Sequence, residues 1–312
     1  MKGLRVPPRR AFDVVGLGEI AVDHLCVVPR IPGASDKVRM VRFEVQGGGQ
    51  VATAMIACQR LGLKAKYLGK VGDDRWGAWS IEQLAREGVD ASGVRVAPGS
   101  TQTAFIMVHE ATGERTVVWH CDEAQLPDPA ELRREEIASG RAFHVDATGL
   151  ARGLEPLRWA REAGCLTSID IDHPLPDTEE ALRLVDLCVL PEGFSEQIAG
   201  ERDLEKALRR LQRLNPQAVV CATLGARGCV ALDGESLIHE PAFAVDVADT
   251  TACGDVFHAA FVCTALWEWP LREAMRFANA AAALKARKLG GRPGIPTKAE
   301  VEGFLRDRAG AP

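Results

Sequence analysis

Apolar residues along the chain follow two alternating patterns, short runs and longer amphipathic segments. The short runs are rich in β-branched residues and predict strands at residues 12–17, 65–71, 142–145, 166–171, 187–190 and 218–224. Between most of them, apolar residues at helical spacing predict helices at residues 51–61, 76–87, 153–162 and 204–214. Strands and helices that alternate in this order predict an α/β fold with a mostly parallel sheet and helices on both faces.

Two regions, residues 23–46 and 101–120, interrupt this alternation. They contain the extended stretches LCVVPR, KVRMVRFEVQ, TAFIMVHE and ERTVVWH, and the turn ATG joins the last two. We expect a small antiparallel sheet that covers a ligand or makes a dimer contact; the alternative is an extension of one edge of the main sheet. No repeat or long linker occurs, so residues 1–312 are predicted to form a single domain with these two lid segments inserted.

The last third of the chain is dominated by helical periodicity. One long helix is predicted from about Asp255, because Val256, Ala260 and Cys263 share a face, and a second is opened by Pro270. The segment DTTACGD, residues 249–255, therefore lies at the N-terminus of the first of these helices.

Small residues mark the start of that helix, at Ala252, Cys253 and Gly254. The N–H groups of a first helical turn lack partners within the helix, and together with the helix dipole they can bind a phosphate group. Small side chains permit its close approach. The same field would keep Asp255 ionised, so that it can accept a proton from a substrate hydroxyl. The alternative is an ordinary N-cap, an Asp or Thr in front of a core helix.

Composition and charge narrow the class of partner. The 312 residues are 46% hydrophobic, enough for a sizeable core, and 38 basic and 43 acidic residues give a net charge of -5 without a long basic block. We therefore expect a small solute as partner, and neither nucleic acid nor a membrane. The nine cysteines lack metal-type pairing, and no apolar export segment follows the N-terminus, so a cytoplasmic protein with reduced thiols is predicted.

The segment DTTACGD resembles the motif D-T-x-G-A-G-D of the ribokinase/PfkB carbohydrate kinases. Other segments resemble that family in the same order along the chain: VGLGEIAVDHL, GGQVATAMIACQRLG, KVGDDRWG, FHVDA, CATLGARG and FANAAAALKARKLGG. The stretch GERTVVWH and the spacing of the last helix are similar to the ketohexokinase branch of the family.

The resemblance implies a fold and an activity. The fold would be a three-layer α/β/α ribokinase-like domain with a small β-sheet lid, through which a homodimer would form. The activity would be transfer of a phosphoryl group from ATP, with Mg²⁺, to a hydroxyl group of a sugar or polyol. The resemblance also implies a monovalent cation site near Asp249, and hence a possible dependence on K⁺.

The resemblance also assigns site residues. Asp255 would be the catalytic base, and the amides of Ala252, Cys253 and Gly254 the anion hole. The substrate would contact Asp23, Gly48, Gly49, Gln50, Thr53, Asp146 and Asp255. The nucleotide would contact Thr223, Gly225, Gly228, Gly254 and Asn279. For Gln50 and Thr53, simple capping of the following helix is the alternative.

The chain departs from the family pattern at three places. Ala252 replaces the first glycine of the motif, which costs about 1 kcal/mol if that position needs a positive φ. Thr53 replaces an asparagine of the sugar-binding motif. The N-x-x-E motif associated with magnesium is missing, Glu192 and Glu196 being the nearest acids, so the metal ligands are unknown.

Two alternatives to a sugar kinase stay open on the sequence: a protein of the same fold that binds sugar or nucleotide with little catalysis, and a nucleoside kinase. A third interpretation, a dinucleotide-binding turn at GLGEIA, requires a helix directly afterwards. The following segment is extended and contains Pro29 and Pro32, which disfavours it. The seven histidines lack zinc-ligand spacing, and His258 is a candidate to support Asp255, the alternative being an ordinary packing residue.

Overall fold

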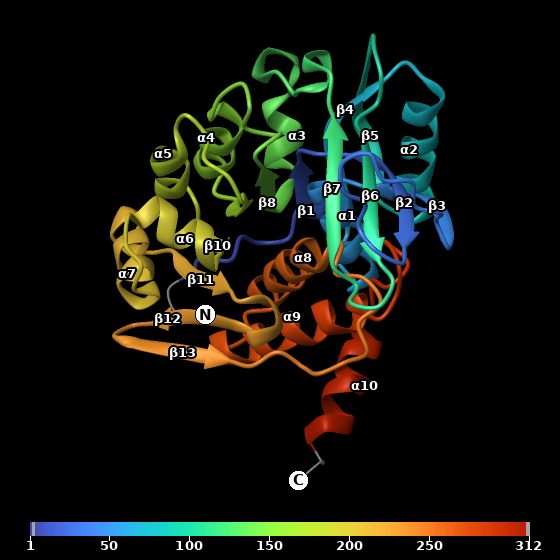
Figure 1. Cartoon of the computed structure of the whole chain (residues 1–312). Coiled ribbons are helices and arrows are strands. Elements are labelled where there is room, and N and C mark those ends of the chain that lie inside the picture. Colours follow the sequence, from blue (N-terminus) through green and yellow to red (C-terminus); the bar gives the residue numbers. More distant parts are fainter. Residues whose placement is uncertain (2–3, 310–312) are drawn as a thin grey trace.

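A nine-stranded sheet forms the centre of the molecule. The computed structural model describes residue 1 and residues 4–309. In spatial order the sheet consists of β13 (Ser236–Glu240), β12 (Cys229–Asp233), β11 (Val219–Thr223), β10 (Leu187–Pro191), β9 (Leu166–Asp170), β8 (Gly140–Asp146), β1 (Phe12–Leu17), β4 (Ala65–Gly72) and β5 (Asp90–Ala97). All neighbours pair in parallel except β11–β12 and β12–β13 (Figure 1).

Helices cover both faces of this sheet, as the periodicity predicted. One face packs against α1 (Gln50–Arg60), α2 (Arg75–Arg86), α8 (Cys253–Leu266), α9 (Leu271–Ala286) and α10 (Lys298–Ala309). The other packs against α3 (Arg134–Ala138), α4 (Glu155–Glu162), α5 (Thr178–Arg183), α6 (Glu192–Ala199) and α7 (Leu204–Leu214). Alternation along β1 shows why two layers form, because Val14 enters the first core and Val15 the second. The three-layer α/β fold is confirmed.

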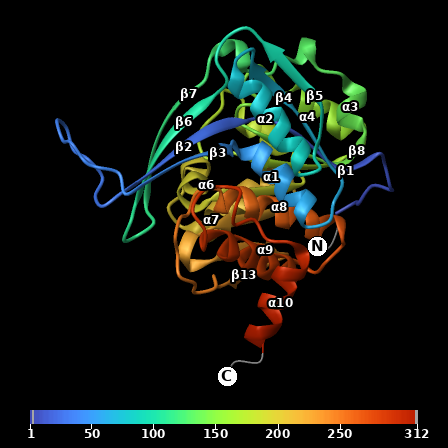
Figure 2. The same cartoon turned by 90° about the vertical axis from the view of Figure 1, so that its right-hand side faces the viewer.

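A second sheet of four strands projects from the body (Figure 2). Its order is β3 (Arg42–Gly48), β2 (Ala21–Val28), β6 (Thr103–His109) and β7 (Arg115–His120), so the predicted lid is a separate sheet and the edge-extension alternative is wrong. The expectation of an antiparallel sheet is wrong for its central pair: β2 and β6 are parallel, because residues 49–102, which contain α1 and α2, form a long crossover between the two hairpins. We call this sheet the lid.

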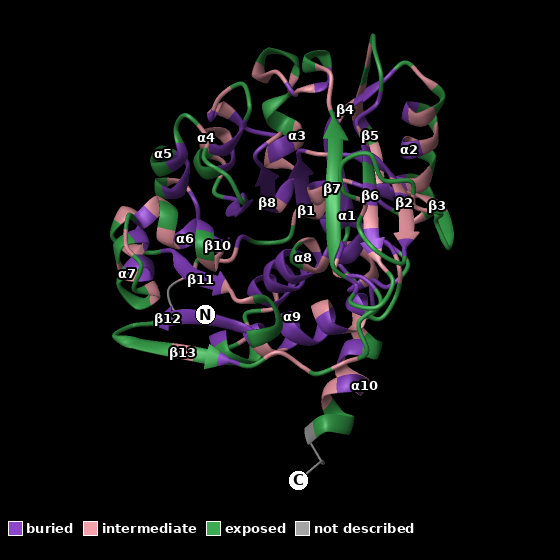
Figure 3. Cartoon of the chain, in the orientation of Figure 1, coloured by how far each residue is buried: buried purple, intermediate pink, exposed green. Residues whose placement is uncertain are grey.

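Only the face of the lid that turns toward the body has a core. Leu25, Ala104, Ile106 and Val108 are buried there. The whole of β7 is exposed, and Figure 3 shows it green along its length. The lid is therefore held mainly along one face and at its ends.

The pattern analysis missed several elements. The six predicted strands match β1, β4, β8, β9, β10 and β11, whereas β5, β12, β13, α3, α5, α6 and α10 were not predicted. Pro270 precedes α9 as its N-cap and does not lie within its first turn. All nine cysteines are free thiols, as expected. Among the described residues, no helix combines the length and apolar character that crossing a membrane requires.

Candidate active site

The carboxyl edge of the parallel sheet gathers acidic side chains from three neighbouring strands. Glu19 follows β1, Asp146 ends β8 and Asp170 ends β9, where it stands directly opposite Asp146 in the register. The chain order of the sheet reverses between β8 and β1, and ligands of open α/β sheets bind at such a point. Asp23 lies in β2 of the lid and Asp255 in the first turn of α8. We call these five residues, Glu19, Asp23, Asp146, Asp170 and Asp255, the acid floor.

Short-range contacts bind the centre of the acid floor together. The N–H groups of Glu19 and Gly149 donate to the two carboxylate oxygens of Asp146, each at 2.8 Å. The Glu19 carboxylate accepts from the Gln50 N–H at 3.4 Å and from the side-chain amide of Gln102. Burial raises the pKa of Glu19 to about 8, and the neighbouring charge of Asp146 adds to that shift. Burial likewise raises the pKa of Asp146 to about 7.

The predicted sugar-binding glycines lie beside this floor. A Cβ on Gly48 would come within 2.2 Å of the Asp23 carboxylate, so only glycine fits there. Gly49 has φ 89° and is the N-cap of α1, without a side-chain cap. Burial raises the pKa of Asp23 to about 6, and the charge of Arg292 opposes that shift. Arg292 is itself buried and donates from Nη2 to the Gly48 carbonyl at 2.8 Å.

Gln50 and Thr53 do not act as helix caps. Gly49 caps α1 with no side-chain hydrogen bond, so the capping alternative is wrong. Among the described residues the Thr53 hydroxyl is buried without a hydrogen-bond partner, whereas Gln50 is half-buried at the first position of the helix. Neither side chain therefore serves to cap α1.

Asp255 lies in the first turn of α8, one helical turn before His258. His258 Nε2 is 3.3 Å from Asp170 Oδ1, and both side chains are buried. Burial raises the pKa of Asp255 well above its usual range, Asp170 adds to the shift, and Arg115 opposes it. In the free protein, burial and a neighbouring carboxyl therefore oppose the helix dipole that was expected to keep Asp255 ionised.

The turn in front of α8 has the open amides that an anion requires. Ala252 is the N-cap, in the left-handed region at φ 63°, and has no side-chain cap, so the ordinary N-cap alternative is wrong. The Cys253 N–H is already used, because it donates to the Thr250 carbonyl at 3.2 Å. In the described chain no backbone acceptor is bonded to the Ala252, Gly254 and Asp255 N–H groups, and a Cβ on Gly254 would meet open space. These three amides are the ones left for a phosphate group.

At the base of this turn, hydrogen bonds from other groups of the chain occupy Asp249. Asp249 is completely buried; its Oδ1 accepts from the Thr251 N–H at 2.8 Å and the Thr251 hydroxyl at 2.7 Å, and its Oδ2 accepts from the Gly290 N–H at 2.7 Å. The ammonium group of Lys285, also buried, donates to the Asp249 carbonyl at 2.9 Å. Sequence reasoning named Asp249 but not Lys285.

The lid brings Arg115 over the turn. Its Nη1 donates to the Thr250 hydroxyl at 2.8 Å, although the two residues are 135 positions apart. A cavity of about 540 Å³ lies here, lined by Ile31, Glu114, Arg115, Thr116, Val117 and Thr250. The lid is thus in contact with the segment that leads to Asp255.

The predicted nucleotide residues divide into two groups. Thr223 ends β11, and Gly225 follows at φ 59° with open space around it, so both face outward at the sheet edge. Gly228 is packed instead, since a Cβ there would lie 2.1 Å from the Glu240 carbonyl. The buried Asn279 amide donates to that same carbonyl at 3.0 Å. Gly228 and Asn279 therefore hold the loop after β13, and their contact with a nucleotide would be indirect.

In the described part of the chain, Glu192 and Glu196, the acids nearest to the missing N-x-x-E motif, do not form a metal site. The Glu192 carboxylate is engaged by Arg227, and Glu196 lies further along α6. Within residues 1 and 4–309, no group of three or more His, Cys, Asp or Glu side chains is arranged to hold a metal ion.

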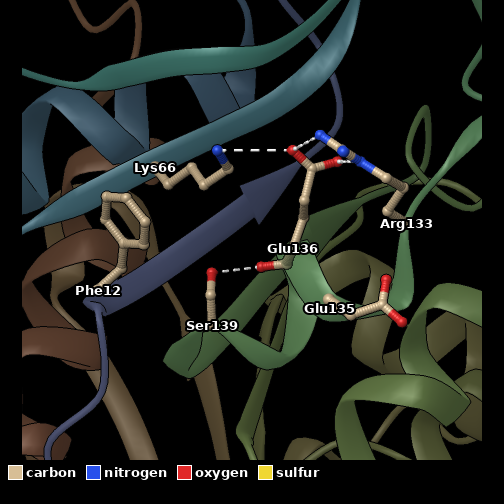
Figure 4. A pocket seen from close by; sticks show the side chains of 6 residues that line it. All are labelled: Phe12, Lys66, Arg133, Glu135, Glu136 and Ser139. Atoms are coloured by element: carbon tan, nitrogen blue, oxygen red, sulfur yellow. Dashed lines mark hydrogen bonds and ion pairs between the residues drawn. The ribbon is translucent and has the colours of Figure 1, made fainter.

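A second cavity, of about 360 Å³, lies at the opposite edge of the main sheet, near the starts of β1 and β8 (Figure 4). Its charged groups pair among themselves: Glu136 lies 3.6 Å from Lys66 and 3.2 Å from Arg133. This cavity is remote from the acid floor, at the opposite end of the strands.

Sequence reasoning missed Glu19, Asp170, Arg115, Arg292 and Lys285. The first two carried a signal, because Glu19 lies just after one apolar strand of a sheet predicted to be parallel and Asp170 ends another, as Asp146 does. The carboxyl ends of such strands meet at one edge. The other three become neighbours of the site only through tertiary contacts.

Comparisons with known proteins agree with this geometry. Residues 11–298 match the family model described as pfkB family carbohydrate kinase. The chain is 30% identical to fructokinase-1 of Oryza sativa subsp. japonica, over 94% of this chain and 97% of that protein. It is 29% identical to the ribokinase of Haemophilus influenzae, over 93% of this chain and 97% of that protein. The crystal structure of an Agrobacterium tumefaciens protein assigned as a ribokinase superposes with a TM-score of 0.88 at 28% identity, covering 96% and 99% of the two chains.

Some of the similar structures contain bound ligands. An E. coli protein assigned as ribokinase II, in complex with ATP and Mg²⁺, superposes with a TM-score of 0.78 at 21% identity and covers 95% of this chain and 99% of its own. At that identity the likeness concerns the fold.

Proposed function

The chain belongs to the pfkB family of carbohydrate kinases, and from that premise we propose that it transfers the γ-phosphoryl group of ATP to a hydroxyl group of a free sugar or polyol. It is a sugar kinase, a phosphotransferase with an alcohol group as acceptor. The observation that supports the residue-level proposal is the meeting of Asp255, three open amides and the acid floor at one edge of the sheet.

The acceptor is proposed to lie over the acid floor. Asp23, Asp146 and Thr53 would bind its hydroxyl groups, together with Gln50 at the start of α1. Gly48 and Gly49 would allow the chain to approach it closely, because a Cβ at either position would collide with the protein. Buried carboxyls with raised pKa values suit neutral polyhydroxy compounds, since such groups exchange hydrogen bonds with hydroxyls. Glu19 and Asp170 extend the same surface.

The phosphoryl donor is proposed to lie along the nucleotide side. ATP would pass Thr223 and Gly225, with Gly228 and Asn279 supporting the adjoining loop, and its terminal phosphate would face Gly254 and the Ala252–Cys253 turn. The Gly254 and Asp255 amides would stabilise the charge that develops during transfer. Bound Mg²⁺ would neutralise the phosphate oxygens, and none of the chain's residues is assigned as its ligand.

Asp255 is proposed as the catalytic base. The acceptor oxygen attacks the γ-phosphorus, the bond to the β–γ bridging oxygen breaks, ADP leaves, and the hydroxyl proton passes to Asp255. A carboxylate whose pKa is raised toward the working pH is a stronger base than an ordinary one. Most of the acceleration would come from positioning and charge stabilisation, as in other phosphoryl transfers.

The lid is proposed to serve this site and a second copy of the chain, within a single domain that spans residues 1–312. Arg115 reaches the turn from β7, which supports a lid over the acceptor. Large apolar side chains on the lid are exposed: Phe43, Phe105, Val117, Val118 and Trp119. They support a homodimer through this sheet, which light scattering of the purified chain would test. Likeness to the ketohexokinase branch stays a prediction.

Potassium is left out of this proposal. The Asp249 carboxylate, the predicted ligand, already has three donors of the chain on it.

The test is release of ADP from ATP and Mg²⁺ over a panel of ketoses, aldoses, inositols and nucleosides. Asp255→Asn serves as the inactive variant, and Asp246→Asn, an exposed acid in the preceding loop, is the matched control. We expect release that depends on one class of sugar or polyol, retained in Asp246→Asn and lost in Asp255→Asn while ATP still binds. Turnover by Asp255→Asn at the wild-type rate would refute the assignment of the base, and a response to nucleosides alone would refute the substrate class.

A further inference from the structure

Lys285 is a charged residue that no step of the proposed mechanism uses, yet it is completely buried next to the catalytic turn. It lies in the last turn of α9, whose neighbour α8 carries Asp255 (Figure 1). A buried ammonium group is costly unless the protein pairs it. The burial of the Lys285 ammonium group must therefore be compensated by its contacts.

The ammonium group bonds to the base of the turn. Its Nζ donates to the main-chain carbonyl of Asp249 at 2.9 Å. The side chain of the same residue accepts from Thr251 and Gly290, on the two sides of the site. Lys285 therefore joins the end of α9 to the segment that sets the position of the anion-binding amides.

The charges around Lys285 come from three elements. Burial lowers the pKa of Lys285, and Cys253 and Asp249 oppose this shift, followed by Asp255. Arg115, from the lid, is the other cation nearby and acts in the same direction as burial. The ammonium group thus interacts electrostatically with the thiol and carboxyls of the turn, and its positive charge at the base of the turn favours a phosphate group at the Gly254 amide.

A monovalent cation near Asp249 was the expectation from the sequence, and the residues present do not fit one. A potassium ion binds main-chain carbonyls and carboxylate oxygens, but here the Asp249 carbonyl accepts from an ammonium group and both carboxylate oxygens accept from N–H or O–H donors. Ala248 and Asp249 also donate their N–H groups to the Ala286 carbonyl, at 2.8 and 3.2 Å, which closes the same segment against α9. The cation at this site is therefore the ammonium group of Lys285, which is part of the chain.

We propose that the Lys285 ammonium group takes the place of a monovalent cation beneath the anion-binding turn, so that this kinase orders its turn with a cation of its own and works without potassium. Lys285 is then a positioning residue, acting on the phosphate through Asp249 and the turn. This inference rests on the proposed kinase function.

The test compares activity in 100 mM potassium chloride and 100 mM choline chloride, about equal in ionic strength and far above contaminating potassium. We expect the wild-type rates to agree within about twofold, since the built-in cation is always present. We expect Lys285→Ala to lose at least about tenfold in kcat in choline, because the turn loses its cation, and to recover part of that loss in potassium or ammonium chloride. Lys285→Met, which keeps the volume, should lose the same activity but respond to neither salt.

Lys288→Ala is the matched control, because it removes an exposed lysine from the same helix end. It should resemble the wild type in both salts. A wild-type rate in choline below one tenth of the rate in potassium would overturn the proposal, and so would a Lys285→Ala enzyme as fast as the wild type in choline. The wild-type comparison decides the question even if Lys285→Ala fails to fold.

Calorimetric titration with MgATP separates this inference from the proposed function. If no acceptor supports turnover, the kinase assignment fails. The cation inference is then judged by the Kd for MgATP, which should be equal in potassium and choline for the wild type and weaker for Lys285→Ala in choline. A wild-type Kd that tightens tenfold in potassium would refute it.

Discussion

Asp249 and Asp255 lie at the two ends of one turn and differ in how the protein bonds their carboxylates. Asp249 receives three hydrogen bonds and is fully buried. Among the described residues, no other side chain donates a hydrogen bond to Asp255, and burial and Asp170 raise its pKa. A carboxylate bonded on all sides holds structure, whereas one left unpaired is available to a substrate proton. Two regions can be distinguished on this basis. In the turn base, which we define as Asp249, Lys285 and Gly290, the polar groups bond to one another, whereas the acid floor contains a carboxyl available to a substrate.

Replacement of Asp255 should give the largest effect of all, a loss of activity without a loss of stability. Asp255→Asn removes the base and is expected to lower kcat about a thousandfold. At pH 8 the same change should raise the melting temperature, because a buried carboxyl that the fold disfavours in its charged form is replaced by a neutral amide. Steady-state assays and thermal unfolding measure the two outcomes. A loss of both activity and stability would mean that Asp255 is structural, as Asp249 is.

Replacement of Asp249 should give the opposite result, a large loss of stability. Asp249→Ala leaves the Thr251 and Gly290 N–H groups without an acceptor, which should lower the free energy of unfolding by about 2–3 kcal/mol. Asp249→Asn retains one acceptor oxygen and should lose less. Urea denaturation is the measurement, with Asp246→Ala as an exposed control. Equal stability of Asp249→Ala and the control would contradict the distinction between the two ends.

The acid floor should make stability depend on pH. Glu19 and Asp146 have pKa values of about 8 and about 7 in the folded protein, both raised chiefly by burial. The folded chain then binds more protons than the unfolded chain above about pH 4, so this contribution to stability falls as pH rises from about 4 to about 8. Melting temperatures between pH 5 and pH 8.5 should decrease more steeply for the wild type than for Glu19→Gln. The exposed Glu110→Gln is the control, and identical slopes for all three proteins would count against the buried, proton-binding floor.

The smallest effect concerns the strained alanine between the two regions. Ala252 has φ 63°, and Glu268, beyond the other end of α8, has φ 60°. A side chain in the left-handed region destabilises the folded state by about 1–2 kcal/mol. Replacement by glycine removes this strain, but part of the gain is lost because glycine makes the unfolded chain more flexible. Ala252→Gly and Glu268→Gly should each raise the free energy of unfolding by about 1 kcal/mol or less. Only Ala252→Gly should change turnover, by moving the amides; equal turnover in both would show that the amides already stand where catalysis needs them.

Local patterns accounted for the α/β order and for the turn, but they failed where a residue's role comes from distant neighbours. Six strands and the start of α8 could be predicted because apolar periodicity and small residues are local signals. Asp146 was named from its motif, whereas Asp170, opposite it in the next strand, was not. Lys285 looks like an ordinary lysine at a helix C-terminus, where the helix dipole favours it. Its buried bond to Asp249 is visible only once α9 is placed beside the turn.

The sequence by itself determined the alternation of strands and helices, the small residues before Asp255 and the two lid segments, because these depend on neighbours within a few positions. The tertiary structure decided which carboxyls are bonded and which are left to titrate. Desolvation and charge depend on side chains brought together from β1, β8, β9 and α8, and on an arginine that reaches the turn from the lid. The chemistry of the site follows from that convergence, which no stretch of the chain contains alone.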